Sequence, residues 1–427
     1  MTAVWSPGRA PTGRCATSIP VSGPTLRPRQ RPVPSDRNRS PRPVKAPAGK
    51  AAALRRSEIR VLFDAADRIG GDVIRLEVGE PSFTTPAHVI DAAARAAHDG
   101  HTGYGPNGGL ASLRELLAGK LRRVNGIEAS IDEIVVTPGG MNALYSVYLA
   151  LLQPGDEVLL PTPGFPNMDE TVTLLGGRPV FYPLAAEAGF LPEIEALEAR
   201  VTERTKILFV NTPANPTGAV YPASLMGDLV DFAARHDLWL LCDEVYDEMV
   251  LSDGCVHTAA APLDPDGRVI TVCSFSKVYA MTGWRVGYAV APVATADLLR
   301  KLQEPLVSCP STISQKAAEA ALTGPRAPYE QMLAAYRRRR DVAFDVAAST
   351  GVRAVPSDGT LYMMLDVSAA GVDDLDFALE LLNSHSVSVA PGSVFGPAGR
   401  GWARISLAAE EEAIAEGLRR LAKTLHE

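Results

Sequence analysis

The sequence predicts an α/β fold, with a largely parallel sheet covered by helices on both faces and a smaller α+β domain. Helical stretches such as 142–151 and 222–236 separate short apolar runs, and apolar strands joined by helices are typical of parallel sheets. A chain of 427 residues with 46% hydrophobic content also exceeds one small core, so two domains are expected. The seven strand-like runs are 133–137, 157–161, 179–182, 206–210, 239–242, 269–273 and 286–290.

The alternation of strands and helices changes character toward both ends of the chain. Residues 57–69 and 89–98 carry the apolar spacing of amphipathic helices. After about residue 325, a basic helical stretch at 329–349 is followed by strand-like segments at 361–366, 387–390 and 402–406. We expect the N-terminal part of the small domain at 51–85, a large domain at 86–324 and the C-terminal part of the small domain at 325–427.

The first fifty residues differ in composition from the rest of the chain. They interleave proline with Arg, Ser and Gly, and hold ten Lys or Arg against the single acid Asp36. Such a segment cannot bury enough apolar surface to fold, so residues 1–50 are expected to form a disordered basic tail. A stretch upstream of the true start site is an alternative. An organelle transit segment is a third, which the helix-breaking prolines disfavour.

Charge and cysteine usage restrict the classes of partner. The net charge is −7, and the chain beyond the basic tail is strongly acidic, which argues against nucleic acid as the main ligand. The five cysteines form no CxxC pair, as expected of reduced thiols in a cytoplasmic protein. No apolar window approaches the roughly 18 residues of a membrane-spanning helix. No metal site is expected, because His98 and His101 lack a third ligand.

A lysine follows one of the predicted strands within the segment SFSKVYAMTGWRVGY. Lys277 stands just after the apolar run 269–273, where its amine could be desolvated and become deprotonated. Ser274, Ser276 and Arg285 supply two hydroxyls and a planar set of donors suited to a dianionic phosphate. Taken alone, the segment could equally be a surface lysine beside a helix-capping serine.

Polar residues also follow three other predicted strands, and ligands gather at the carboxyl ends of such strands. The loop 137–142, TPGGMN, opens a helix and could seat an anion on its backbone amides. The loop 211–218 would hold Asn215 in a fixed place as a hydrogen-bond donor. Alternatively, the loop could be rigid without binding any ligand. Asp243 ends a buried run, where a carboxylate is costly unless a cation pairs with it. A helix cap or a salt bridge remains an alternative for Asp243.

Together these segments resemble the fold-type I pyridoxal 5'-phosphate (PLP) enzymes, specifically the class I/II aminotransferases of the aspartate aminotransferase superfamily. The resemblance runs from about residue 76 to 420. Its motifs, in the order of the family, are LEVGEPSFTTP, TGYGPNGG, TPGGMNAL, NTPANPTGAVYP, CDEVY, SFSKVYAMTGWRVGY and ARISLA. The resemblance implies an enzyme that moves an amino group between an L-amino acid and a 2-oxo acid.

The resemblance also implies the role of each residue around the cofactor ring. Lys277 would hold PLP as a Schiff base and move the proton of the substrate Cα. Asp243 would pair with the pyridine nitrogen. Tyr246 and Asn215 would donate to the 3-hydroxyl oxygen, and Phe165 would stack on the ring, with core packing as its alternative.

Further implied roles concern the phosphate, the substrate and the oligomer. The phosphate would be held by the backbone at Gly140 and Met141 and by the side chains of Ser274, Ser276 and Arg285. Tyr104 would reach the phosphate of a neighbouring subunit, which implies a homodimer with shared active sites. Arg404 would grip the substrate α-carboxylate, with Gly79 allowing a segment of the small domain to close over it.

Departures from the family pattern bear on the substrate. Met141 occupies a position where some members that use acidic substrates have a lysine, and no other cation for a distal carboxylate is evident. An apolar, aromatic or small amino donor is therefore expected. Ala214 and Leu361 also depart from the pattern and are expected to line the pocket. A PLP-dependent C–S lyase, decarboxylase or cyclase is the alternative function, and a PLP-binding regulator is a remote one.

Overall fold

The computed structural model describes residues 45–46, 48–52, 54 and 57–426. The chain divides into two compact units, residues 1–47 and 48–427, and all that follows concerns the second unit. The predicted tail at 1–50 lies outside the described residues except for its last few positions, of which Gly49 begins the single-turn helix α1 (Gly49–Ala52). Within the described ranges, no helix is long and apolar enough to cross a membrane.

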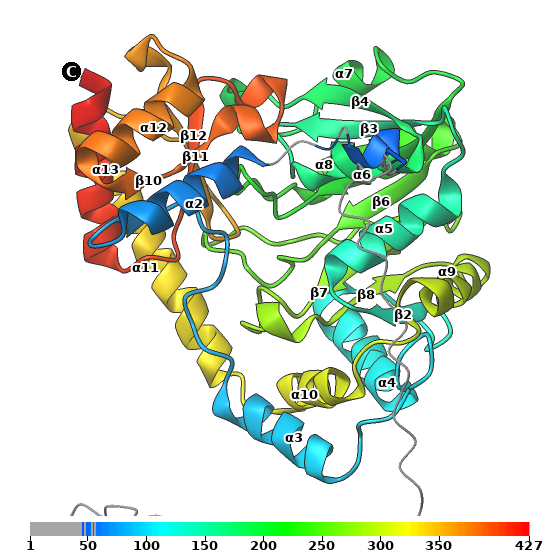
Figure 1. Ribbon diagram of the computed structural model, residues 1–427. Helices are drawn as coiled ribbons and strands as arrows, with labels where there is room; N and C mark the ends of the chain where they lie inside the picture. The colour runs from blue at the N-terminus through cyan, green and yellow to red at the C-terminus, as the bar shows by residue number, and fades with distance from the viewer. Residues whose placement is uncertain (1–44, 47, 53, 55–56, 427) are drawn as a thin grey trace, which may run out of the picture. The chain divides into compact units, whose positions relative to one another are not determined.

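A seven-stranded sheet forms the centre of this unit, with the strand order β2-β8-β7-β6-β5-β3-β4 (Figure 1). Strand β8 runs opposite to the other six strands, which share one direction, so the prediction of a mostly parallel sheet is confirmed. Each of the seven predicted apolar runs supplies one of these strands. Their bounds are β2 Ile134–Thr137, β3 Glu157–Thr162, β4 Arg178–Pro183, β5 Thr205–Asn211, β6 Trp239–Asp243, β7 Val269–Ser274 and β8 Gly287–Val290.

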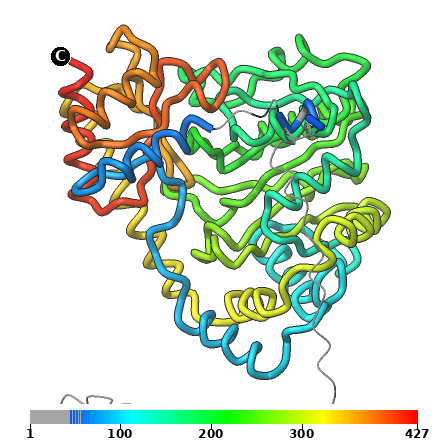
Figure 2. The backbone as a smooth tube through the Cα atoms, in the orientation of Figure 1, coloured from blue at the N-terminus to red at the C-terminus, as the bar shows by residue number. Residues whose placement is uncertain are grey.

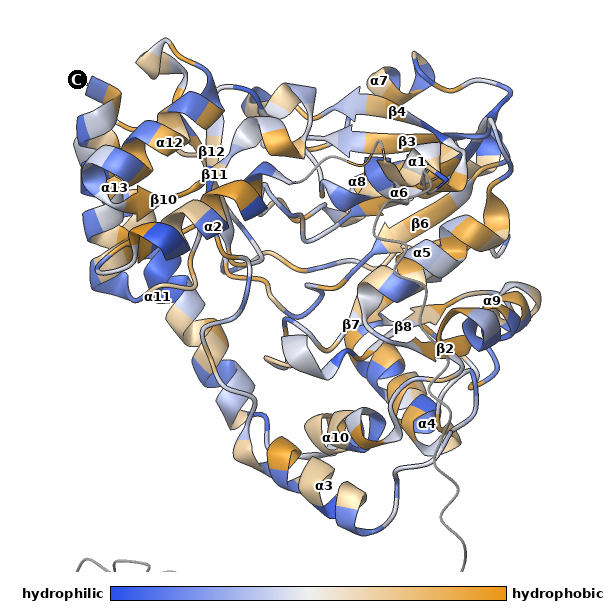
Figure 3. Ribbon diagram, viewed as in Figure 1, coloured by the Kyte–Doolittle hydropathy of each residue, from blue (hydrophilic) through white to orange (hydrophobic). Residues whose placement is uncertain are grey.

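Both faces of this sheet are buried, because successive side chains along each strand enter two different cores. On β5, Ile207 and Phe209 pack into one core, whereas Leu208 and Val210 pack into the other. Strands β2 and β6 are coloured as hydrophobic along much of their length in Figure 3. The absence of polar alternation in the sequence therefore reflects helices on both sides of the sheet.

Helices α5, α6 and α9 supply side chains to the first of these cores, and α8 supplies side chains to the second. Other helices of this part of the chain pack beside the sheet, including α10, which lies against α3 and α4. A short π-helical segment, Leu121–Asn125, continues α4. The bounds are α3 Ala87–His98, α4 Ala111–Lys120, α5 Gly140–Leu151, α6 Asn167–Leu175, α7 Ile194–Glu198, α8 Ala223–Arg235, α9 Val293–Val307 and α10 Thr312–Thr323.

A two-stranded sheet joins the beginning of this unit to its C-terminal part, and a three-stranded sheet lies within the C-terminal part. Strand β1 (Ile74–Arg75) pairs in parallel with β10 (Val387–Ser388), and β11 (Ala390–Pro391), β12 (Trp402–Ser406) and β9 (Tyr362–Asp366) form a three-stranded antiparallel sheet. The prediction of one strand at 387–390 is wrong, because Val389 separates two short strands that belong to different sheets. The helices here are α2 Glu58–Ile69, α11 Ala327–Thr350, α12 Asp374–His385 and α13 Glu411–His426.

The chain passes twice between the small sheets and the seven-stranded sheet, before α3 and along α11 (Figure 2). Arg339 of α11 joins these passages, since its Nη1 donates to Ser82 Oγ at 2.9 Å and to the carbonyl of Leu407 at 3.3 Å. In the large sheet, the neighbouring strands β5, β6 and β7 end at Asn211, Asp243 and Ser274. Their carboxyl ends therefore bring the polar residues of three loops to one edge.

Candidate active site

A pocket of about 610 Å³ opens at this edge of the sheet. It is lined both by loops of the large sheet and by residues of α2, the segment after β1, β9 and β12. Of the thirteen site residues predicted from the sequence, the structure brings twelve together here. They are Gly79, Gly140, Met141, Phe165, Asn215, Asp243, Tyr246, Ser274, Ser276, Lys277, Arg285 and Arg404. The thirteenth, Tyr104, lies outside this pocket and is 93% exposed.

One end of the pocket has the donors of an anion site. The hydroxyls of Ser274 and Ser276 lie 3.0 Å apart beside the first turn of α5, which begins at Gly140. The Arg285 guanidinium lies so close to Gly139 that a β-carbon there would overlap it. Gly139 also has a φ of 85°, a conformation that favours glycine. Free backbone amides at a helix start, two hydroxyls and a guanidinium suit a phosphate.

Asp243 is a buried carboxylate at the end of β6, with only 3% of its surface exposed. Its Oδ1 accepts a hydrogen bond from the backbone of Val245 at 3.3 Å, and it has no ion-pair partner among the residues that the structure describes. The pKa of Asp243 is raised to about 7, chiefly by burial and also by the charge of Glu244, although the Val245 amide and Lys277 act to lower it. The carboxylate therefore lacks a close cation, and a cationic ligand group would stabilise it.

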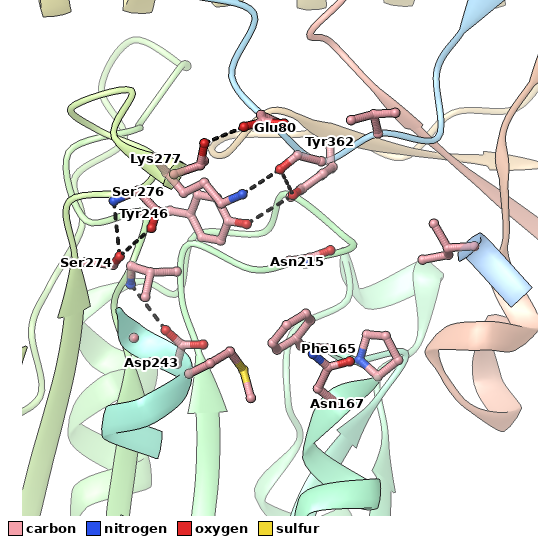
Figure 4. A pocket seen from close by; sticks show the side chains of 18 of the residues that line it. Glu80, Phe165, Asn167, Asn215, Asp243, Tyr246, Ser274, Ser276, Lys277 and Tyr362 are labelled. Carbon is pink, nitrogen blue, oxygen red and sulfur yellow. Dashed lines mark hydrogen bonds between the residues drawn. The ribbon is translucent and has the colours of Figure 1, made fainter. Parts of the chain in front are cut away.

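The amine of Lys277 lies beside two tyrosine hydroxyls (Figure 4). Lys277 Nζ donates to the carbonyl of Gly79, which also accepts a hydrogen bond from Tyr362 Oη at 3.3 Å. The Tyr246 and Tyr362 hydroxyls are 3.1 Å apart. A β-carbon at Gly79 would overlap the Tyr362 hydroxyl, so glycine is required for this close approach. The segment after β1 thus positions the lysine.

Arg404 of β12 is buried within the same pocket. It donates to Asn215 Oδ1 at 3.0 Å and to the carbonyl of Glu77 at 2.7 Å, while its Nε has no partner. The guanidinium carbon lies 4.3 Å from the ring centre of Tyr362 and 4.8 Å from that of Phe395. Burial lowers the pKa of the guanidinium, but two aromatic faces stabilise the cation. The unpartnered Nε leaves a donor for a carboxylate ligand.

The structure adds pocket residues that sequence reasoning missed and removes two that it expected. Tyr362 lies at the centre of the site, and Arg60 of α2 lines the pocket as a further cation. Arg60 could not be found from its local sequence, because an amphipathic helix carries exposed arginines in any case. Ala214 and Leu361 were expected to line the pocket, but both are packed in hydrophobic cores and do not line it.

Comparison with known proteins identifies the class of enzyme. The family model described as aminotransferase class I and II matches residues 71–421. The aspartate aminotransferase of Pyrococcus abyssi is 40% identical over 375 residues, covering 87% of this chain and 96% of its own. The aspartate/prephenate aminotransferase of Thermus thermophilus is 40% identical over 361 residues, covering 84% and 92%. The solved aromatic aminotransferase of Pyrococcus horikoshii has a TM-score of 0.81 at 39% identity, covering 86% and 98%.

The chain therefore belongs to the class I and II aminotransferases, and it has their PLP-dependent fold type I architecture. It is a PLP-dependent transaminase, as the sequence predicted.

The described side chains fit this cofactor. PLP has a phosphate, a ring nitrogen that accepts a proton and an aldehyde that reacts with an amine. The pocket has the anion site at Gly140, Ser274, Ser276 and Arg285, and the Lys277 amine. The buried carboxylate of Asp243, which lacks a close cation, suits a protonated ring nitrogen.

The anion site depends on a close approach of two backbone segments, which gives a test. A β-carbon at Gly287 would stand 2.5 Å from the backbone nitrogen of Gly140 and 2.6 Å from the carbonyl carbon of Gly139. Gly287→Ala is therefore expected to displace the phosphate loop and to weaken PLP binding by about fivefold or more, as a cost of about 1 to 3 kcal/mol for overpacking implies. Fluorescence titration of the apoenzyme with PLP measures the affinity.

Gly283→Ala is the matched control, because a β-carbon at Gly283 meets nothing within 4 Å. Wild-type affinity in Gly287→Ala would contradict the inferred role of this contact.

Proposed function

We propose that the enzyme uses the pocket residues in the roles that the resemblance assigned to them. Lys277 would hold the cofactor covalently, and its amine would take and return the proton at the substrate Cα. Asp243 pairs with the ring nitrogen, and PLP supplies the acceptor for the amino group and for the electron pair of the broken Cα–H bond. Tyr246 and Asn215 hold the ring hydroxyl, and Phe165 packs on the ring. The buried carboxylate of Asp243 is the observation that carries this proposal.

The anion site then holds the cofactor phosphate, through the backbone of Gly140 and Met141 and the side chains of Ser274, Ser276 and Arg285. At the other end of the pocket, Arg404 binds the α-carboxylate of the amino acid. The unpartnered Nε of Arg404 supports this role, since a carboxylate would complete its hydrogen bonds. The Gly79 segment, which contacts both Lys277 and Tyr362, closes over the substrate.

We also propose a domain division that serves this site. The large PLP-binding domain comprises residues 86–324, and the small domain comprises 51–85 and 325–427. The pairing of β1 with β10 supports the assignment of both chain segments to one small domain. A cytoplasmic location is proposed as well, because Cys242, Cys255, Cys273 and Cys309 are free thiols.

For the substrate, we propose an amino donor with an apolar or aromatic side chain and a 2-oxo acid acceptor that can carry a second carboxylate. Met141, Leu144, Phe165 and Phe63 contribute apolar surface to the pocket wall, which suits the donor. The exposed Arg60 on α2 suits a distal carboxylate. One of the relatives described above is named an aspartate/prephenate aminotransferase and another an aromatic aminotransferase, and both kinds of substrate agree with this wall.

The test of the reaction is a half-reaction with single amino acids. Mixing the PLP form with a panel of amino acids is expected to give one 2-oxo acid per aminated cofactor, with the highest rates for apolar or aromatic donors. Release of ammonia, thiol or CO₂ in place of the 2-oxo acid would contradict transamination.

Lys277→Ala is expected to lower the rate of this half-reaction by at least about 10²-fold, the lower range of general acid–base catalysis. A variant that transaminates at the wild-type rate would contradict the role of Lys277.

The two pocket arginines are expected to act on different carboxylates. Arg404→Gln removes the α-carboxylate partner and should raise KM for every amino acid, with a loss of about 2 to 5 kcal/mol for a buried charge pair. Arg60→Met should weaken only dicarboxylic substrates, by about fivefold, since Arg60 is exposed and its ion pair is screened. Steady-state kinetics with a dicarboxylic and an aromatic substrate distinguish them. An equal effect of Arg60→Met on both substrates would contradict its assignment.

A homodimer with shared sites is proposed because Tyr104 is 93% exposed yet matches a phosphate-binding tyrosine of the family. Tyr104→Phe should weaken PLP binding, and mixing it with Lys277→Ala subunits should restore activity. A mixed dimer has one site with both substitutions and one site with neither. Activity no greater than the sum of the two separate variants would contradict shared sites, provided that native mass spectrometry shows that mixed dimers formed.

A further inference from the structure

Five buried polar side chains form a network outside the pocket, just beyond the strand that carries Asp243. They are Lys120, Asn125, Glu244, Asp247 and His257, and none of them lines the pocket. They come from α4, the π-helical segment, the turn after β6 and the loop that follows. The side chains of the four titratable residues are at most 5% exposed. Burial of so many charges is costly unless they pair with one another.

Lys120 and Asp247 make the first pair in this network. The ammonium of Lys120 contacts the Asp247 carboxylate and also donates to Asn125 Oδ1 at 2.8 Å. Burial lowers the pKa of Lys120, but the charge and hydrogen bond of Asp247, together with Glu248 and Cys273, outweigh burial, so the pKa is raised above its ordinary value. Burial raises the pKa of Asp247, but Lys120, His257 and Asn125 together outweigh burial, so the pKa is lowered. Both groups are therefore charged at neutral pH.

His257 and Glu244 make the second pair. His257 Nε2 lies 3.0 Å from Glu244 Oε2, and Asn125 Nδ2 joins the two pairs by donating to Asp247 Oδ2 at 3.0 Å and to Glu244 Oε2 at 3.4 Å. Burial lowers the pKa of His257, and Lys120 lowers it too, but Glu244 and Asp247 outweigh them, so it is raised. The imidazole is therefore the partner that can bring a positive charge to Glu244.

The other titratable groups that face the two pairs add no unpaired charge to the network. Glu248 also faces Lys120, but it is paired with Arg326. Cys273 faces Lys120 as well, and burial raises the pKa of its thiol well above the ordinary value, which keeps it neutral. Burial also raises the pKa of the Tyr279 and Tyr288 hydroxyls well above the ordinary value, so these hydroxyls stay neutral.

The network is continuous with the cofactor site through the turn after β6. Glu244 directly follows Asp243, the last residue of β6, and the amide of Asp247 donates to the carbonyl of Glu244 at 3.0 Å. A negative charge on Glu244 disfavours a second negative charge on the adjacent Asp243. Lys120 faces Asp247, and His257, when protonated, brings a second positive charge to Glu244, so the carboxylate left without a cation is Asp243.

We propose that Lys120 and His257 are positioning residues that neutralise Asp247 and Glu244, so that Asp243 alone presents a negative charge to the cofactor ring nitrogen. The proposal rests on the proposed role of Asp243. His257 acts through Glu244 and touches neither cofactor nor substrate. Loss of its charge would leave Glu244 uncompensated and favour the proton on Asp243, which weakens the pairing with the ring nitrogen.

Equilibrium titration of the full-length apoenzyme with PLP tests this directly. His257→Gln is expected to weaken PLP binding by about tenfold, which corresponds to a change of one pKa unit at Asp243. The difference from the wild type should narrow at alkaline pH, where wild-type His257 also loses its proton. His236→Gln is the matched control, because His236 lies 2.8 Å from Glu198 in a more exposed pair of the same kind. It should bind PLP as the wild type does.

Substitution of Glu244 separates a charge effect from a merely structural one. Glu244→Gln and the double variant Glu244→Gln/His257→Gln remove the carboxylate that needs compensation, so both should bind PLP about as tightly as the wild type. If the pair served only to hold the turn, each of these variants would be as weak as His257→Gln. That result, or wild-type affinity in His257→Gln at neutral pH, would overturn the proposal. Failure of the wild type and His236→Gln to bind PLP would instead contradict the cofactor assignment itself.

Discussion

The active site depends on one constraint: a carboxylate is held in the protein interior without a cation beside it. Asp243 ends the central strand β6, is 3% exposed, and burial raises its pKa to about 7. Such a group is unfavourable in the free protein, and it becomes favourable when a ligand brings a positive charge to it. The site is therefore arranged to bind a cofactor whose ring nitrogen can carry a proton. The polar network beyond the strand is consistent with the same requirement.

The fold places the other groups around this carboxylate by simple means. Parallel strands bring Asn211, Asp243 and Ser274 to one edge, and the start of α5 adds backbone amides for a phosphate. The segment after β1 then brings its carbonyls over this edge, where Gly79 accepts from Lys277 and Glu77 from Arg404. Because the lysine and the arginine bind to one short segment, movement of that segment would couple substrate binding to the position of the lysine.

Much of this could be predicted from the sequence, because strands buried on both faces and short polar motifs are local signals. All seven strands of the large sheet were predicted in this way, and twelve residues that the motifs or the family resemblance indicated line one pocket. The predictions that were wrong or missing concern features that depend on tertiary contacts. The run 387–390 divides between two sheets only because each half finds a different partner strand. Arg60 lines the pocket because of the packing of α2, whereas Leu361 is buried in the core. Neither position could be predicted from the neighbouring residues in the sequence. The pairing of Lys120 with Asp247 joins positions 127 apart in sequence.

The assignment of this pocket as the PLP site is tested most directly by locating the covalent bond between the cofactor and the protein. The holoenzyme is reduced with borohydride, which makes the carbon–nitrogen bond permanent, then digested, and the peptides are identified by mass spectrometry. We expect the mass of reduced pyridoxyl phosphate on the peptide that contains Lys277, and addition of an amino donor before reduction should remove this mass. Detection of this added mass on another lysine, or on no peptide of a holoenzyme that transaminates, would contradict the assignment of Lys277.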